Sequence, residues 1–154
     1  MSSESIPEYK VILASNSSIR KKILEDSGIS FEVIPSEVEE EELKQSLSND
    51  NFKDYCLALA KAKALDVSNK KKNAYVIGSD QICCFEEEIF SKPLTKENCF
   101  KTLSKLSGNT HYQNCGISIC KGGKEIWSHY AQAALTMKSL SDSEIKDYID
   151  KDEP

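Results

Sequence analysis

Long apolar runs are absent from this sequence, and glycine and proline are scarce. The longest apolar stretches, such as Val11–Ala14 and Ile117–Cys120, are far too short to cross a bilayer, so we expect no membrane span. With 6 Gly and 4 Pro among 154 residues, the chain is neither collagen-like nor of low complexity. Its 39% apolar and 29% charged residues exclude compositional disorder. These proportions predict a soluble globular protein whose residues 1–154 form one domain.

An excess of basic residues is also missing. The 20 Lys and Arg residues face 25 Asp and Glu residues, which gives a net charge of -5. Duplex nucleic acid requires a broad basic face, so we expect no nucleic-acid partner, although a local basic pocket can still bind a small anion. Met1–Glu8 lacks the basic and apolar regions of a secretion signal, and a cytoplasmic location is therefore expected.

Cysteine and histidine spacings typical of disulfide scaffolds or zinc sites are not found. No C-x-x-C occurs, and a chain of this length needs no bridges, so reduced and mostly buried thiols are expected. His111 and His129 have no ligand spacing with the cysteines, which argues against zinc. The six cysteines are Cys56, Cys83, Cys84, Cys99, Cys115 and Cys120.

The N-terminal part of the chain has the pattern strand, helix, strand. Tyr9–Ala14 is a short β-branched run, and after a serine-rich turn an apolar-periodic stretch predicts a helix that Gly28 ends. Phe31–Ile34 predicts a second strand, stopped by Pro35. The apolar residues of the predicted helix are Ile19, Ile23 and Leu24.

The middle of the chain predicts one long helix and one buried strand. Residues 36–50 are acidic and polar, which is typical of a loop or of an exposed first helical turn. A helix is predicted from Phe52 to about Leu65, and a strand over Ala74–Ile77 that ends at Gly78-Ser79-Asp80.

The C-terminal part predicts a helix, a hairpin and a second helix. Thr95 is a suitable N-cap for a helix through Leu106 that Gly108 ends. Residues 113–120 and 125–136 flank Lys121–Lys124, whose central Gly122-Gly123 favours a hairpin of two antiparallel strands. Ser141 and Glu144 have capping-box spacing before the last helix. This alternation of strands and helices predicts an α/β fold.

A serine-rich turn followed by cations favours anion binding at the first predicted helix. Residues 15–18 are Ser-Asn-Ser-Ser, and Arg20, Lys21 and Lys22 follow in the first turn. Cations are unfavourable at a helix N-terminus, where unpaired N–H groups attract anions, so a bound phosphate would relieve the charge. The alternative is a solvated basic patch on an ordinary helix.

Other candidate residues are weaker when taken singly. Asp80 follows a buried strand, where a carboxylate can bind a divalent cation or accept a proton from water, but Asp after Gly is often only a turn residue. Lys63 lies on an apolar helix face and Lys92 precedes a proline, yet a lysine among apolar residues usually extends to the surface. The acidic residues Glu37, Glu39 and Glu40 are most often a solvated run.

Taken together, these segments resemble the Maf family in order and approximate spacing over nearly the whole chain. The resemblance implies a Maf/ITPase-like α/β fold, a mixed sheet flanked by helices with a central cleft. It also implies a nucleoside triphosphate pyrophosphatase that uses a divalent metal, Mg or Mn, that is linked to septum formation, and that forms a homodimer. The matching segments are Leu13–Arg20, Glu37–Glu40, Leu59–Ala64, Gly78–Gln81, Lys92–Thr95 and Leu106–Gly108.

The resemblance also assigns roles to individual residues. Asp80 matches the catalytic proton acceptor, and Glu40 matches the acidic residue on the metal side. The matches to triphosphate-binding positions are Ser15, Arg20, Lys63 and Lys92. In-line attack of water on the α-phosphorus needs a carboxylate, a metal and several cations, and these residues provide the protein's part.

Two positions bear on the base of the nucleotide. Gln81 follows the catalytic position, where the family has Gln in enzymes for 7-methyl-GTP and Thr in enzymes for dTTP and UTP. Ile19 stands where the 7-methyl-GTP subgroup usually has Trp. The resemblance therefore favours 7-methyl-GTP, with dTTP or UTP as the alternative.

The chain departs from the family pattern in several places. Ser18, Lys21 and Ser91 replace the usual Pro, Arg and Gly, and the sequence ends before the family's C-terminal segment. We therefore keep a second hypothesis, in which the chain is a catalytically impaired nucleotide-binding regulator linked to cell division.

Overall fold

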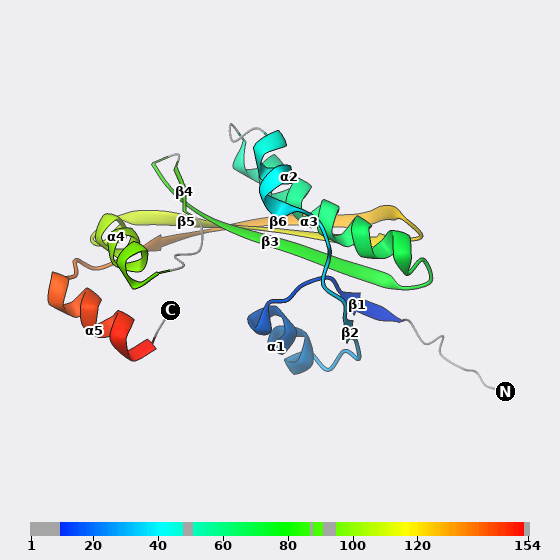
Figure 1. The fold of residues 1–154 in the computed structure, drawn as a ribbon, viewed down its shortest axis with the longest axis horizontal. Coiled ribbons are helices and arrows are strands. Elements are labelled where there is room, and N and C mark those ends of the chain that lie inside the picture. The colour runs from blue at the N-terminus through cyan, green and yellow to red at the C-terminus, as the bar shows by residue number, and fades with distance from the viewer. Residues whose placement is uncertain (1–9, 48–50, 87, 91–94, 153–154) are drawn as a thin grey trace. The chain divides into compact units, whose positions relative to one another are not determined.

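The computed structural model describes residues 10–47, 51–86, 88–90 and 95–152 (Figure 1). Contacts divide the chain into two compact units, of which unit 1 contains residues 1–80 and 115–131 and unit 2 contains residues 81–114 and 132–154. No helix within the described ranges is both long and apolar enough to cross a membrane. The elements are β1 (Val11–Leu13), α1 (Ser18–Asp26), β2 (Glu32–Val33), α2 (Glu40–Ser46), α3 (Phe52–Lys70), β3 (Tyr75–Phe85), β4 (Glu88–Phe90), α4 (Lys96–Leu106), β5 (Thr110–Lys121), β6 (Lys124–Thr136) and α5 (Asp142–Asp152).

Six strands form one mixed sheet, in agreement with the predicted α/β class. The strand order is β2-β1-β3-β5-β6, and β4 pairs with β3. β1 runs parallel to both β2 and β3, with Leu13 opposite Val33 and Ile77. β4 is antiparallel to β3, and its pairing begins at Cys83. The central cleft that the family resemblance implies stays a prediction.

In unit 1, α3 lies close against β3 and β5 because both strands present a glycine to it. A Cβ atom at Gly78 would overlap the carbonyl oxygen of Ala60, and one at Gly116 would lie 2.8 Å from that of Cys56. The core beside this contact is made of small and β-branched side chains, which suits such a close approach. These core residues are Ile12, Ala14, Ala64, Val67, Ala74, Val76 and Cys120.

Two predicted ends in unit 1 were wrong, and burial explains both. α3 does not end near Leu65 but continues to Lys70, because Val67 and Ser68 remain buried in its last turns. β3 does not end at Gly78 but continues to Phe85, since burial goes on through Ile82 and Cys84. Gly78 marks a close helix contact rather than a turn, and Asp80 therefore lies inside a strand.

The helices of unit 2 begin as their sequences predict. The Thr95 hydroxyl accepts a hydrogen bond from the Asn98 N–H at the start of α4. At α5, Ser141 and Glu144 form the reciprocal bonds of a capping box. The two helices pack through a small core that contains Cys99, Ile145 and Ile149, together with Phe100, Leu103 and Leu140.

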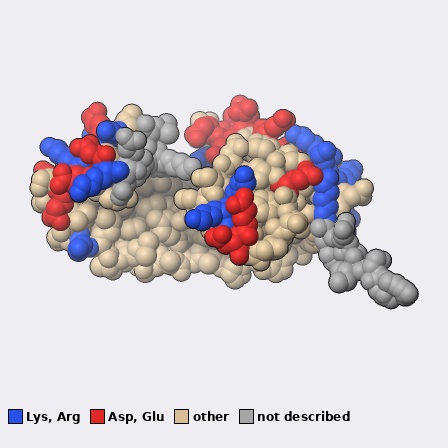
Figure 2. Space-filling model, turned by 90° about the horizontal axis from the view of Figure 1, so that it is seen from below, with Lys and Arg blue, Asp and Glu red and all other residues tan. Residues whose placement is uncertain are grey.

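The helix α1 differs from the apolar pattern that predicted it. Ile19 is 73% exposed and Ile23 is 62% exposed, and no residue of α1 is buried. Its periodic apolar residues therefore do not form a core face. Charges of both signs lie side by side on the face shown in Figure 2. The surface ion pairs include Lys21–Glu25 of α1 and Lys101–Glu97 of α4.

Candidate active site

The serine-rich turn after β1 forms a compact polar corner at the start of α1. The Ser15 hydroxyl, 8% exposed, accepts a bond from the Ser17 N–H at 3.1 Å and one from Arg20 Nη1 at 3.3 Å. Ser17 is the N-cap, and its hydroxyl accepts from the Arg20 N–H. Because Ser15 accepts twice, its own O–H remains a donor for an oxyanion. No acidic residue lies in the first turn of α1, which leaves the positive end of the helix uncompensated.

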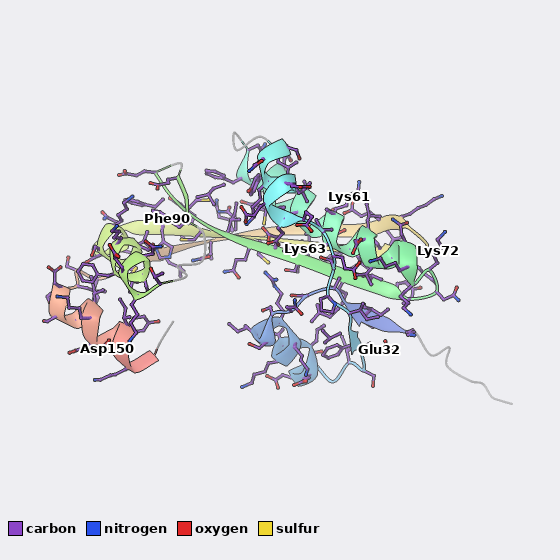
Figure 3. The ribbon with its side chains drawn as sticks, in the orientation of Figure 1. Glu32, Lys61, Lys63, Lys72, Phe90 and Asp150 are labelled. Carbon is purple, nitrogen blue, oxygen red and sulfur yellow. The ribbon has the colours of Figure 1, made fainter. Side chains whose placement is uncertain are left out.

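A lysine bridges two carboxylates in the same unit. Lys63 of α3 lies on the side of the helix that faces β3 (Figure 3). Its Nζ atom is 3.1 Å from Asp80 Oδ1, and it also forms an ion pair with Glu40, the first residue of α2. The Lys63 side chain is only 12% exposed, so it does not extend into solvent as an isolated lysine usually does. The structure therefore brings together three residues that lie far apart in the sequence.

The two carboxylates in this cluster titrate in opposite directions. Burial raises the pKa of Asp80, and the negative charge of Glu40 adds to this, while Lys63 and Arg20 oppose it in part. Burial also raises the pKa of Glu40, but the hydrogen bond and charge of Lys63 outweigh it, so that pKa lies below its ordinary value. Asp80 is thus the better proton acceptor of the two, because its ionised form is the less stable one.

One oxygen of Asp80 has no partner. Oδ1 accepts from Lys63, whereas Oδ2 is buried without a hydrogen bond. A buried carboxylate oxygen without a partner costs free energy, and a native protein keeps such an atom where a ligand or proton comes to it. The cluster therefore offers one oxygen for a cation or for the proton of a water molecule.

Sequence reasoning missed two residues of this region. The Cys56 thiol donates to the backbone carbonyl of Asp80 at 3.1 Å, and Tyr55 is buried nearby. Burial raises the pKa of Tyr55, and the charges of Asp80, Glu41 and Glu40 raise it further. The only sequence signal was that Cys56 precedes Lys63 by seven residues, which places both on one helix face.

The remaining predicted residues do not join this cluster. Ile19 is exposed on α1, and Glu37 pairs with Lys70 instead. Gln81, the next residue of β3, is exposed and lies on the opposite face from Asp80, since neighbouring strand residues alternate. Its Nε2 atom donates to Gln113 Oε1 at 3.0 Å. Lys92, like Ser91 and Pro93, lies outside the described residues.

Within the described ranges, the histidines and cysteines form no cluster of their own. All six cysteines are free thiols, and four of them are buried. His111 is buried in β5 with Nδ1 unpartnered, while His129 stacks on Trp127 at 5.7 Å between ring centroids. Among the described residues, no three His, Cys, Asp or Glu side chains are grouped as ligands for a metal ion.

Comparison with known families identifies the family to which the chain belongs. The model of the family described as Maf-like protein matches residues 10–154. The chain belongs to the Maf family. The polar corner at Ser15 and the Lys63 cluster thus lie in a Maf domain.

Curated relatives in this family carry enzyme names. The chain is 36% identical over 152 residues to the nucleoside triphosphate pyrophosphatase of Legionella pneumophila (strain Paris), covering 99% of this chain and 76% of the relative. It is 37% identical over 142 residues to the 7-methyl-GTP pyrophosphatase of Brucella abortus, covering 91% of this chain and 71% of that protein.

A solved structure supports the fold. A HAM1 protein from Coxiella burnetii superposes with a TM-score of 0.53 over 82% of this chain and 71% of that chain. Sequence identity to it is 13%, so the likeness concerns the fold alone. The predicted Maf/ITPase-like architecture is confirmed.

The residues of the Maf domain fit a divalent metal by charge and by donor type. Glu40 and Asp80 are hard oxygen donors, and Asp80 Oδ2 is free to bind. The two negative charges of Glu40 and Asp80 balance the two positive charges of Lys63 and Arg20. These four side chains together therefore offer a polyanion no net positive charge. Mg²⁺ usually takes one or two carboxylates and completes its shell with waters and substrate phosphates, which matches this arrangement.

Proposed function

We propose that this chain is a nucleoside triphosphate pyrophosphatase that converts 7-methyl-GTP to its monophosphate and pyrophosphate. The observation that carries the proposal is the Lys63 bridge between Glu40 and Asp80, which leaves Asp80 Oδ2 buried and unpartnered. Membership of the Maf family and the enzyme names of its curated members support the same activity.

The phosphate end of the nucleotide is assigned to the corner at the start of α1. Arg20 donates charge-assisted hydrogen bonds to phosphate oxygens, and the Ser15 O–H donates a further one. The N-terminal N–H groups of α1 favour an anion at the same place. Lys63 adds a second cation, and Lys92 is assigned to phosphate by the family resemblance alone.

Asp80 is assigned as the proton acceptor. A water oxygen bonds to the α-phosphorus, the bond from that phosphorus to the bridging oxygen breaks, and pyrophosphate leaves with the electron pair. The water's proton goes to Asp80 Oδ2, which burial holds ready to accept it. Lys63 keeps the carboxylate in place through Oδ1.

A divalent cation, Mg²⁺ or Mn²⁺, would be held by Glu40 and Asp80. When bound, it neutralises phosphate charge and polarises the phosphoryl oxygens. Lys63 bridges these two carboxylates, so we expect it to shift toward the phosphates when the cation binds.

The base of the nucleotide is assigned to Gln81. Its amide can donate and accept hydrogen bonds, so it can recognise a base edge. The 7-methyl-GTP pyrophosphatase name of the Brucella abortus relative supports this choice of base.

Pyrophosphate release from a nucleotide panel tests the proposal. The full chain is incubated with 7-methyl-GTP, GTP, dTTP and UTP, with Mg²⁺, with Mn²⁺ and with a chelator. We expect metal-dependent release that is fastest with 7-methyl-GTP. Fastest release from dTTP or UTP would show that the chain is a pyrophosphatase for those nucleotides instead. Nucleotide binding without pyrophosphate release would favour the catalytically impaired regulator. A cytoplasmic location, a homodimer and a link to septum formation stay predictions.

A further inference from the structure

Gln113 of β5 contacts the residue assigned to the base. Gln81 Nε2 donates to Gln113 Oε1 at 3.0 Å, and β3 and β5 are neighbours in the sheet. Gln113 also hydrogen-bonds to the Cys83 thiol of β3. Burial raises the pKa of this thiol, and the hydrogen bond opposes that effect in part. The Gln113 oxygen accepts from Gln81, so the NH₂ group at the other end of the amide is the donor available to Cys83. All three residues lie in unit 2.

These two contacts use opposite ends of the Gln113 amide. Its oxygen accepts from Gln81 Nε2 at 3.0 Å, and its NH₂ group is the donor at the other end of the amide. Gln81 must then donate, and its own NH₂ group is turned toward Gln113. The carbonyl oxygen of Gln81 remains as the group that an exposed side chain offers to a ligand.

We propose that Gln113 is a positioning residue for base recognition, which fixes the Gln81 amide so that its oxygen faces the base. The inference rests on the proposed function, since it concerns the same nucleotide. An outward carbonyl matches a guanine-type base, whose N2 amino group and N1–H are adjacent donors. It disfavours uracil and thymine, whose single N3–H lies between two carbonyl acceptors. Without Gln113 the amide can rotate and offer either end.

A merely structural hydrogen bond would behave differently. Loss of the Gln81–Gln113 bond would then lower stability and affect all nucleotides alike. A positioning role instead changes the ratio of affinities for guanine-type and pyrimidine nucleotides. The ratio is therefore the decisive readout, and the melting temperature is recorded beside it.

The test compares two variants of the full chain. Gln113→Leu removes the acceptor and the donor at similar size, whereas Gln113→Glu keeps an oxygen that accepts from Gln81. Binding of the α,β-methylene analogues of 7-methyl-GTP and UTP is measured by calorimetry, and kcat/KM by pyrophosphate release. We expect the preference for the 7-methyl-GTP compound to fall about 3- to 10-fold in Gln113→Leu, the size of one hydrogen bond, and to be kept in Gln113→Glu.

A mutant cycle with Gln81→Ala completes the experiment. If Gln113 acts through Gln81, then Gln113→Leu has no further effect on the ratio once Gln81 is Ala. The proposal is overturned by an unchanged ratio in Gln113→Leu, by additive effects in the cycle, by equal binding of the two analogues to the wild type, or by binding of neither. Absence of pyrophosphate release from every nucleotide overturns the proposed function alone, because the binding ratio still decides the role of Gln113.

Discussion

The Cys56 thiol and the Asp80 backbone carbonyl lie 3.1 Å apart, which ties α3 to β3 at the residue assigned to catalysis. Two turns further along α3, Lys63 contacts the Asp80 carboxylate. One helix therefore fixes both the main chain and the side chain of Asp80. Such support holds a reacting group in place better than a loop would.

The first prediction concerns the reaction rate. Asp80→Asn should lower pyrophosphate release about 10²- to 10⁴-fold, because an amide cannot accept the water's proton. The initial rate of pyrophosphate release from 7-methyl-GTP measures the loss, and the melting temperature verifies that the variant is folded. A variant that keeps most of the wild-type turnover would show that another group is the base.

The same substitution predicts a pH dependence of stability. The pKa of folded Asp80 is raised above its ordinary value of 3.8, so the unfolded chain releases this proton first as pH rises. Ionisation of Asp80 therefore costs stability between its ordinary pKa and its raised folded pKa, and the cost persists at neutral pH. We expect Asp80→Asn to be more stable than the wild type at pH 7, with little difference below pH 3.8. Urea unfolding at several pH values measures this, and a constant difference across pH would contradict it.

Removal of Lys63 should weaken the fold as well as the phosphate site. Lys63→Met leaves two carboxylates without their shared cation, and breaking a buried pair costs about 3 kcal/mol. The loss should be smaller at pH 5 than at pH 8, because protonation of Asp80 removes the uncompensated charge. Lys70→Met is the matched control, since its pairs with Glu37 and Asp66 are more exposed and should contribute little to stability. Equal losses in both variants would mean that Lys63 is not held as described.

Arg20 should contribute to phosphate binding specifically. Arg20→Ala is expected to weaken binding of a triphosphate at least several-fold and to leave binding of the corresponding nucleoside unchanged. Lys22→Ala removes the same charge from an exposed position of α1 and should have a smaller effect. Calorimetric titrations with nucleotide and nucleoside compare the two variants. Equal weakening for nucleotide and nucleoside would remove Arg20 from the phosphate site.

Gly78 should tolerate no side chain. In Gly78→Ala the new Cβ overlaps the Ala60 carbonyl oxygen and lies 2.8 Å from the Ala64 N atom. We expect destabilisation of about 1–3 kcal/mol, as for other overpacked cores. The double variant Gly78→Ala, Ala64→Gly should not recover this loss, because the two nearest atoms belong to the backbone. Chemical unfolding measures both, and full recovery in the double variant would locate the strain in the Ala64 methyl group instead.

Local signals of the sequence predicted the starts of helices and the hairpin, whereas tertiary contacts decided the rest. Ser141 and Thr95 act as caps because the capping bond joins residues that are three apart. The sequence pattern predicts a strand end at Gly78, yet this glycine allows α3 to approach β3, a contact between residues that are distant in the chain. The same limit applies to Lys63, whose partners lie 23 residues before it and 17 after it.

The candidate site was predictable only in part, for the same reason. Asp80, Lys63 and Glu40 could be named from motifs, but their shared ion pairs could not. Cys56 shares a helix face with Lys63, but its bond to Asp80 and the bond between Gln113 and Gln81 join residues that are distant in the chain, so the sequence indicates neither bond. Ile19 and Ile23 have helical spacing but cover no core. Periodicity indicates an apolar helix face, but it does not show whether another element packs against that face.

The exposure of α1 has a consequence for how this domain can diversify. No side chain of α1 is buried, so its residues contribute little to the free energy of unfolding. The residues of α1 itself, Arg20 among them, can therefore accumulate substitutions that change anion affinity without a matching penalty in folding, whereas the buried Ser15 cannot. Substitutions in α1 that favour a new ligand would cost the least stability. Every substitution in α3, by contrast, must also preserve its packing around Gly78 and Gly116.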